Sequence, residues 1–302
     1  MKKVIGMKRF GEVFKGIRES RNLTREDVAG DGKMISANHL WKFENGHSDI
    51  TLTKLYFLLE RVGITLQEFE YAANGYELNP IHSLFDQISK LYNENDQRGL
   101  ERLLEVEKSR ICDGGGIKPK VNALIIKGAL KEVDRSLTFT DAEKDTISDY
   151  LLSVDEWGYY ELRLFNITMG ILEPSTVEVL TKDIMRRAVA YKGVKDNEKL
   201  VTTIILNAFM AFTSKKDFKQ ATYFRTVLKD LMKDETDIFT RSLLLFVTGE
   251  MECYQGEEES GKIKMRNAIR IFEIVKSDNL VDSYAMHYKR ITGEEYDISY
   301  MK

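Results

Sequence analysis

The segment LTREDVAGDGKMISANHLWKFENG, residues 23–46, predicts two short helices joined by a tight turn. At its start, Thr24 stands three residues before Asp27. In a capping box, each of these side chains accepts a hydrogen bond from the backbone N–H of the other, so a helix should begin directly after Thr24. Gly30 and Gly32 then permit the positive φ angles of a sharp chain reversal.

The second predicted helix begins after Ser36, whose hydroxyl can cap the first turn, and ends near Gly46, which favours the left-handed conformation of a helix end. Leu40 and Phe43 share one face of this helix, with Ile35 just ahead of them, and should be buried. The opposite face carries Ala37, Asn38, Trp41 and Lys42. A short helix that is polar on its outer face suits the major groove of DNA, so the segment predicts a helix-turn-helix.

The segment resembles the DNA-binding domain of the phage-repressor-like superfamily, at Leu23–Ala29, Ile35–Ser36, Leu40, Lys42–Glu44, Gly46 and Ile50–Leu52. The chain departs from that pattern in two places. The turn at Gly30–Met34 is longer than usual, and Trp41 stands where a small polar residue is usual. The resemblance implies that the second helix binds DNA.

We predict that Asn38 and Lys42 contact base edges, with Ala37 and Trp41 beside them, while nearby arginines hold phosphates. The full set of predicted DNA-binding residues is Arg9, Arg18, Arg25, Ser36, Ala37, Asn38, Trp41, Lys42 and Asn45. An alternative for the cations of the first helix is that they simply form its solvated face.

The charge of the chain is unevenly distributed. The 302 residues carry a net charge of −3, and their number suggests about two domains. Residues 1–65 hold twelve Lys or Arg against eight Asp or Glu, whereas residues 66–302 hold 33 against 40. A basic N-terminal module on an acidic body is typical of a DNA-binding head joined to a sensing or assembly domain.

The composition predicts an all-α protein, since only three prolines interrupt long amphipathic segments. Two cysteines, Cys112 and Cys253, are too few for a disulfide framework or a four-thiolate zinc site, and the sequence does not indicate their roles. No signal peptide or long apolar run is present, so we expect a soluble cytoplasmic protein that does not enter a membrane.

The N-terminal domain should contain five helices and extend over residues 1–71. Its first helix carries Phe10, Phe14 and Ile17 on one side. After the helix-turn-helix, a fourth helix is expected over residues 52–62 and a short fifth helix after Thr65. Residues 72–80, with Asn-Gly and Asn-Pro turn signals, are the predicted linker.

Residues 81–302 predict a series of helix pairs. The expected helices lie near 81–93, 97–111, 119–134, 140–153, 156–170, 175–192, 197–214, 217–232, 237–254, 258–276 and 279–292. The segment from Gly249 to Phe272 resembles a degenerate tetratricopeptide unit, and helix pairs recur about every forty residues. Such pairs stack into an α-solenoid, whose inner wall suits an extended peptide.

The length of the chain, its helix-turn-helix and its helical remainder together resemble the Rgg family of streptococcal and related Gram-positive transcriptional regulators. This resemblance implies a regulator that binds double-stranded DNA and responds to a short peptide pheromone, as in quorum sensing. We also predict a homodimer, because one head contacts only half of a two-fold operator. Candidate interface residues on the last helix are Leu280, Tyr284 and Tyr288.

The predicted peptide-binding residues are Tyr159, Arg163, Asn166, Asn207 and Phe209. The first three follow each other at spacings of four and three, on one helix face, and Asn207 lies within an apolar helix. An asparagine side chain can satisfy both the N–H and the C=O of a peptide backbone, and Arg163 can bind a carboxylate. We expect a short, mostly apolar ligand. The alternative is that each asparagine is structural and connects two helices.

Nothing in the sequence supports catalysis. Gly114–Gly116 lacks the Lys-Ser/Thr continuation of a phosphate-binding loop, and the four histidines show no metal-ligand spacing. We therefore predict no enzymatic activity, no metal and no cofactor. The alternative to a peptide sensor is a DNA-binding head on a ligand-free helical scaffold that recruits a protein partner. An open groove lined by the peptide-binding residues favours the sensor, and a groove filled by side chains favours the scaffold.

Overall fold

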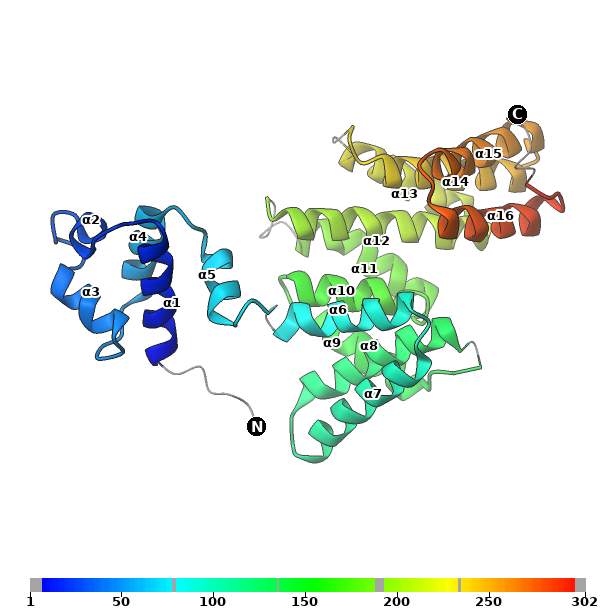
Figure 1. Cartoon of the computed structure of the whole chain (residues 1–302). Coiled ribbons are helices and arrows are strands. Elements are labelled where there is room, and N and C mark those ends of the chain that lie inside the picture. Colours follow the sequence, from blue (N-terminus) through cyan, green and yellow to red (C-terminus); the bar gives the residue numbers. More distant parts are fainter. Residues whose placement is uncertain (1–6, 78–79, 135, 188–192, 233–234, 297–302) are drawn as a thin grey trace. The chain divides into compact units, whose positions relative to one another are not determined.

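The computed structural model of the chain is all-helical and describes residues 7–77, 80–134, 136–187, 193–232 and 235–296 (Figure 1). Sixteen α-helices and no strands occur in those ranges, which confirms the predicted fold class. The contacts divide the chain into two compact units, Met1–Lys90 and Leu91–Lys302. That division falls within a helix, and the predicted linker at 72–80 stays a prediction.

The N-terminal unit contains the five predicted helices and most of a sixth. They are α1 (Met7–Ser20), α2 (Arg25–Ala29), α3 (Ala37–Glu44), α4 (Leu52–Val62), α5 (Leu66–Ala73) and α6 (Pro80–Asn93). One apolar cluster from α1 to α5 holds the head together, with Phe14, Val28, Ile35, Leu40, Phe43, Leu58, Leu59, Val62 and Phe69 at its centre. Because Leu40 and Phe43 are buried there, the opposite face of α3 is turned outward.

The helix ends of the head form where the sequence predicts them. The Thr24 hydroxyl accepts from the Asp27 N–H at 3.0 Å, and the Asp27 carboxylate accepts from the Thr24 N–H at 2.8 Å. Gly46, with φ of 72°, reverses the chain after α3. Its N–H donates to the Phe43 carbonyl at 3.0 Å, and the His47 N–H donates to the Lys42 carbonyl at 2.7 Å. This pair of bonds is a Schellman motif, which satisfies the last carbonyls of α3.

The second unit continues with ten described helices, each within a few residues of a predicted one, and the predicted helical residues 188–192 lie outside the described part of the chain. They are α7 (Gln97–Cys112), α8 (Ile117–Val133), α9 (Asp141–Ser153), α10 (Tyr159–Thr168), α11 (Pro174–Arg187), α12 (Lys195–Ser214), α13 (Phe218–Leu231), α14 (Ile238–Tyr254), α15 (Glu258–Ile274) and α16 (Asp278–Thr292).

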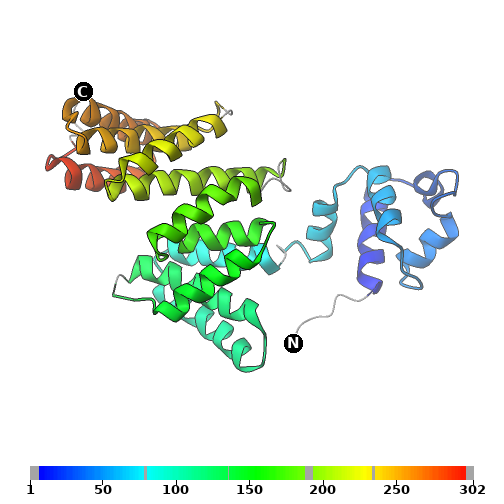
Figure 2. The ribbon, with the colours of Figure 1, turned by 180° about the vertical axis from the view of Figure 1, so that it is seen from behind.

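These helices form two layers. The even-numbered helices α8, α10, α12, α14 and α16 contact one another in succession, and the odd-numbered helices pack against them. Seen from behind, α12 lies between α10 and the α14–α15 pair (Figure 2). In that pair the backbones approach so closely that a Cβ at Gly249 would lie 2.5 Å from the Gly261 carbonyl oxygen. The absence of a side chain at both positions therefore permits the helix contact of the predicted tetratricopeptide-like unit.

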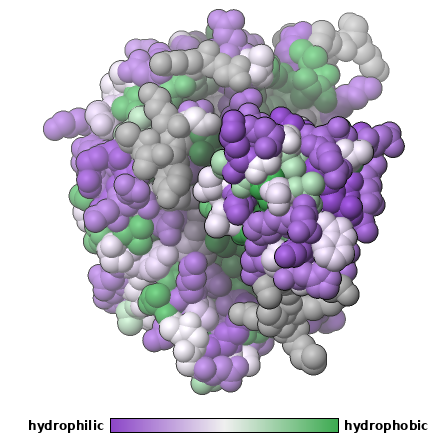
Figure 3. All heavy atoms as spheres, turned by 90° about the vertical axis from the view of Figure 1, so that its left-hand side faces the viewer, coloured by the Kyte–Doolittle hydropathy of each residue, from purple (hydrophilic) through white to green (hydrophobic). Residues whose placement is uncertain are grey.

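The surface shown in Figure 3 is largely hydrophilic, with small hydrophobic areas between polar ones. Among the described residues, no helix combines the length and the apolar character needed to cross a bilayer.

Candidate functional site

The outward face of α3 presents the side chains that sequence analysis assigned to DNA. Asn38 and Lys42 are exposed, and Trp41 keeps 42% of its surface accessible. Ala37 is half-buried at the start of the helix. Asn38 and Lys42 are four residues apart and so share one face, where an amide and an ammonium group are available for base edges.

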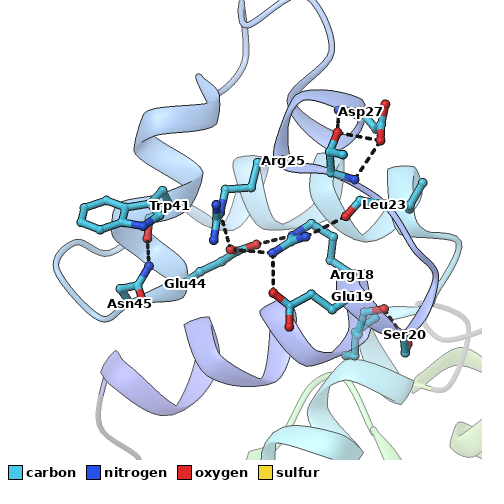
Figure 4. Close-up of polar contacts among 11 residues, drawn as sticks. Arg18, Glu19, Ser20, Leu23, Arg25, Asp27, Trp41, Glu44 and Asn45 are labelled. Carbon is cyan, nitrogen blue, oxygen red and sulfur yellow. Dashed lines mark hydrogen bonds and ion pairs between the residues drawn. The ribbon is translucent and has the colours of Figure 1, made fainter.

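A buried ion network holds α3 in place (Figure 4). The Glu44 carboxylate accepts from Arg18 Nε at 2.6 Å and from Arg18 Nη2 at 2.9 Å, and Arg25 Nε donates to it at 2.7 Å. Arg18 Nη1 donates to the Leu23 carbonyl at 2.7 Å. The Glu44 hydrogen bond raises the pKa of Arg18 above its usual range. These bonds connect α1, the start of α2 and α3, so the network fixes the angle of α3 on the head.

This network corrects the prediction for Arg18. Its side chain is only 6% exposed, and its N–H groups point to Glu44, Glu19 and Leu23, so no side of the guanidinium faces a phosphate. Arg25 is 30% exposed and stays a predicted phosphate contact. The side chain of Arg9 lies outside the described part of the structure. Sequence reasoning missed Glu44, since its distance of 26 residues from Arg18 leaves no local signal.

Two further residues of the predicted set cap α3. The Ser36 hydroxyl accepts from the His39 N–H at 3.2 Å, as expected of an N-cap. Asn45 Nδ2 donates to the Trp41 carbonyl at 2.8 Å at the other end of the helix. Both residues thus have structural roles, and DNA contacts by them stay predictions.

The second unit brings two predicted peptide-binding residues together. Asn207 Nδ2, on α12, donates to Asn166 Oδ1, on α10, at 2.9 Å. Tyr159, Arg163 and Asn166 are all half-buried on α10, and Asn207 is half-buried on α12. Because α10 and α12 are neighbours in the even-numbered layer, these residues lie on two adjacent helices of one wall.

Among the described residues, two polar groups of the amide pair have no hydrogen-bond partner. The bond between Asn207 and Asn166 does not use the Asn207 oxygen or the Asn166 nitrogen. The pair thus retains one acceptor and one donor, which are the two kinds of group that a peptide N–H and C=O require. The geometry also fits the structural alternative, because the bond connects two helices.

Phe209 requires a correction. Its side chain has no exposed surface and belongs to the core, as does Phe165, whose ring packs edge-on against Trp157 at 5.4 Å. A fully buried ring cannot line an open groove, so Phe209 supports the wall from behind. The sequence could not prevent this error, because α12 is apolar on several sides and its pattern does not show which of them faces the core and which faces a groove.

A cavity of about 610 Å³ lies elsewhere in the second unit, between α7, α8 and α9. Leu104, Ile111, Leu124 and the ion pair of Lys127 with Glu143, at 2.6 Å, are among its lining residues. None of the predicted peptide-binding residues lines it.

The described residues contain no group of three or more His, Cys, Asp or Glu side chains arranged to hold a metal ion. Cys112 is exposed and Cys253 is half-buried, and both are free thiols.

A comparison with protein families matches residues 100–286 to the model described as "HTH-type transcriptional regulator Rgg, C-terminal domain". The match covers more than half of the chain and most of the α7–α16 unit.

Solved structures match nearly the whole chain. The SHP pheromone receptor Rgg2 of Streptococcus dysgalactiae is 26% identical, with a TM-score of 0.79 over 93% of this chain and 99% of that one. A protein of Listeria monocytogenes EGD-e is 20% identical, with a TM-score of 0.81 over 94% and 97%. PrgX in its complex with cCF10 is 15% identical, with a TM-score of 0.70 over 96% and 94%. The Listeria protein and PrgX, at these identities, show only that the fold is shared.

Proposed function

The chain belongs to the Rgg family of helix-turn-helix transcriptional regulators, and from this premise we propose that a short peptide bound by its even-numbered helices controls how its head binds DNA. The observation that carries the proposal is the hydrogen bond between Asn166 and Asn207, which brings residues predicted for one peptide site into contact. Since the target of such a regulator is DNA, we also propose that it acts in the cytoplasm.

The head supports the DNA-binding half of the proposal. Its outward helix α3 presents Asn38 and Lys42, and the Glu44 network fixes the orientation of that helix before DNA arrives. Preorganisation of this kind lowers the entropic cost of binding. Arg25, partly exposed beside the network, is the phosphate contact that we retain.

The peptide half rests on the α10–α12 wall and on the relatives. Rgg2, the 26% identical match, is described as a pheromone receptor. In this chain Asn166 and Asn207 would bind the backbone of an extended peptide, with Arg163 and Tyr159 one and two turns away on α10. The peptide switches transcription only if it binds two arrangements of the protein with different affinity.

Calorimetric titration of short apolar peptides into the full chain tests the peptide site. Asn207→Ala should weaken binding by about 1–3 kcal/mol, because a peptide group is then left unpaired against a half-buried wall. DNA binding by the peptide-free variant should match that of the original protein, since the substitution lies in the other unit. Asn267→Ala, an exposed asparagine on α15, is the matched control and should leave the affinity unchanged.

Two results would contradict this assignment. Equal affinity in Asn207→Ala and Asn267→Ala would remove Asn207 from the site. Normal regulation of a reporter gene in the absence of any peptide would favour the ligand-free scaffold instead.

We further propose that the protein is a homodimer whose interface is formed by the C-terminal helices. The predicted interface residue Tyr288 is fully buried and is therefore unavailable. Leu280 is half-buried and stays a candidate, as does Tyr284, which is half-buried and packs against Phe246 at 4.9 Å. The same region exposes a different apolar set, which we call the α14–α15 patch: Ile238, Phe239, Ile274 and Val275, each at least half exposed. The patch is a suitable surface for a second copy of the chain.

A further inference from the structure

Trp41 is the large apolar side chain that remains exposed on α3, a helix that the structure describes in full. A single exposed apolar residue has no special meaning on most surfaces. Here, however, the residue lies on the helix that carries Asn38 and Lys42, and its indole points away from the Arg18–Glu44–Arg25 network (Figure 4). Its place on the outer face therefore requires an explanation other than packing.

A neighbouring aromatic ring packs against the indole of Trp41. The ring of His47 lies against it, with 5.4 Å between the ring centroids and 33° between the planes. His47 reaches that position because Gly46 reverses the chain with its positive φ of 72°. The Trp41 backbone is fixed as well, since its carbonyl accepts from Asn45. These contacts restrict the side chain and so lower the conformational entropy that it loses when it meets a partner.

Helical spacing places two strips side by side on α3. Asn38 and Lys42 form a polar strip, and Ala37 and Trp41, also four residues apart, form an apolar strip next to it. Among the groups on base edges in the major groove, the C5-methyl of thymine is the apolar one. The polar strip suits donors and acceptors of the bases, and the apolar strip suits that methyl group.

We propose that the Ala37–Trp41 strip recognises thymine methyl groups in the operator and so gives the protein a preference for thymine at fixed positions. The proposal rests on the proposed function, in which α3 enters the major groove. The proposal names the DNA group that Trp41 would contact, a residue at which this chain departs from the superfamily pattern.

The test uses the full chain and an operator selected from a random DNA pool. Each thymine is then replaced in turn by deoxyuridine, which lacks the C5-methyl group. At one or more thymines in each half-site, the affinity should fall by about fourfold, the effect of no longer burying one methyl-sized apolar group in the complex. In Trp41→Ala, the affinity for the thymine operator should fall, and the difference between thymine and deoxyuridine should disappear at one or more of those positions, while any thymine read by Ala37 keeps its difference.

Two further variants test whether the indole ring itself causes the thymine preference. Trp41→Gln retains a long side chain without the apolar ring and should lose the same discrimination. Asn38→Ala should lower operator affinity but keep the sensitivity to deoxyuridine, because the apolar strip is intact. Affinity for random DNA should be the same for the original protein and for both Trp41 variants.

The proposal is overturned if deoxyuridine has no effect at any thymine, or if Trp41→Ala keeps the full sensitivity. Either result is compatible with specific DNA binding and leaves the proposed function standing. By contrast, failure of the full chain to select any sequence would contradict the proposed function, and the methyl readout with it.

Discussion

The Glu44 carboxylate accepts hydrogen bonds from two arginines inside the head, and its side chain has no exposed surface. Arg18 is nearly as buried, so its charge depends on this partner. Removing one member of a buried ion pair leaves the other charge uncompensated in a poorly hydrated site. At the level of single residues, Glu44 therefore contributes more to the head than any exposed charge on α3.

Glu44→Ala should lower the free energy of unfolding of the head by about 3–5 kcal/mol, because the Arg18 charge would stay buried without a partner. Glu44→Gln should cost less, since its amide oxygen still accepts a hydrogen bond. Hydrogen exchange of the α1 and α3 amides in the full chain measures the change. Glu26→Ala, an exposed glutamate on α2, is the control, and an equal effect of the two alanine variants would refute the role of Glu44.

Asn38 and Arg25 should affect DNA binding in different ways. Asn38→Ala should cost about 1–3 kcal/mol on the selected operator and little on random DNA, because a base edge is read only in the specific complex. Arg25→Ala should weaken both and lower the slope of log affinity against log salt by about one unit. Fluorescence titrations at several salt concentrations separate the two effects. Asn38 is not a base contact if its variant loses equal affinity on both kinds of DNA.

At the level of helices, the sequence predicted where each helix begins and ends well, because capping residues and turn residues are local signals. Thr65 with Glu68 and Thr140 with Glu143 form capping boxes like that of Thr24, and each starts a helix where expected. Which side chains become buried depends on packing between distant segments. Arg18 and Phe209 were misassigned for this reason. The local sequence pattern around an arginine on an amphipathic helix, or a phenylalanine on an apolar helix, does not determine whether its side chain is buried or exposed.

The C-terminal end of α11 is held by an ion pair with a predictable pH dependence. Hydrogen bonds from Arg186, the larger effect, and from Arg187 lower the pKa of Asp183 from its usual 3.8 to about 2. Arg187 in turn donates to the Val154 carbonyl and stacks on the Trp157 ring, with 5.7 Å to its centroid. Asp183 therefore supports the contact of α11 with the segment that precedes α10.

Because its pKa is lower in the folded state, Asp183 stabilises the fold above pH 3.8, and this contribution disappears as the pH falls towards 2. Asp183→Asn should therefore lower the urea midpoint at pH 7, and the difference from the original protein should shrink between about pH 4 and pH 2. Urea unfolding of the full chain, followed by circular dichroism, gives the midpoints. Asp149→Asn, an exposed aspartate on α9, is the control. A difference that stays constant down to pH 2 would contradict the role of the ion pair.

For the whole molecule, the proposed dimer determines how two heads bind one operator. The α14–α15 patch brings together the start of α14 and the end of α15, where the rings of Phe239 and Phe272 lie 6.2 Å apart. Phe239 is 50% exposed and Ile274 is 63% exposed, so a second copy could bury substantial apolar area there. The two-fold symmetry of such a contact matches that of a palindromic operator.

Sedimentation of the full chain at micromolar concentration should show a dimer. Ile274→Glu should shift it to monomer, since the interface would then bury one unpaired carboxylate from each copy. Val179→Glu changes an equally exposed apolar residue on α11, outside the patch, and should leave the dimer intact. The monomeric variant should bind a two-site operator much more weakly but a single half-site as tightly as before, because linking two heads raises the effective concentration of the second. If Ile274→Glu stays dimeric while Val179→Glu dissociates, the interface lies at α11 and the α14–α15 patch must have another partner.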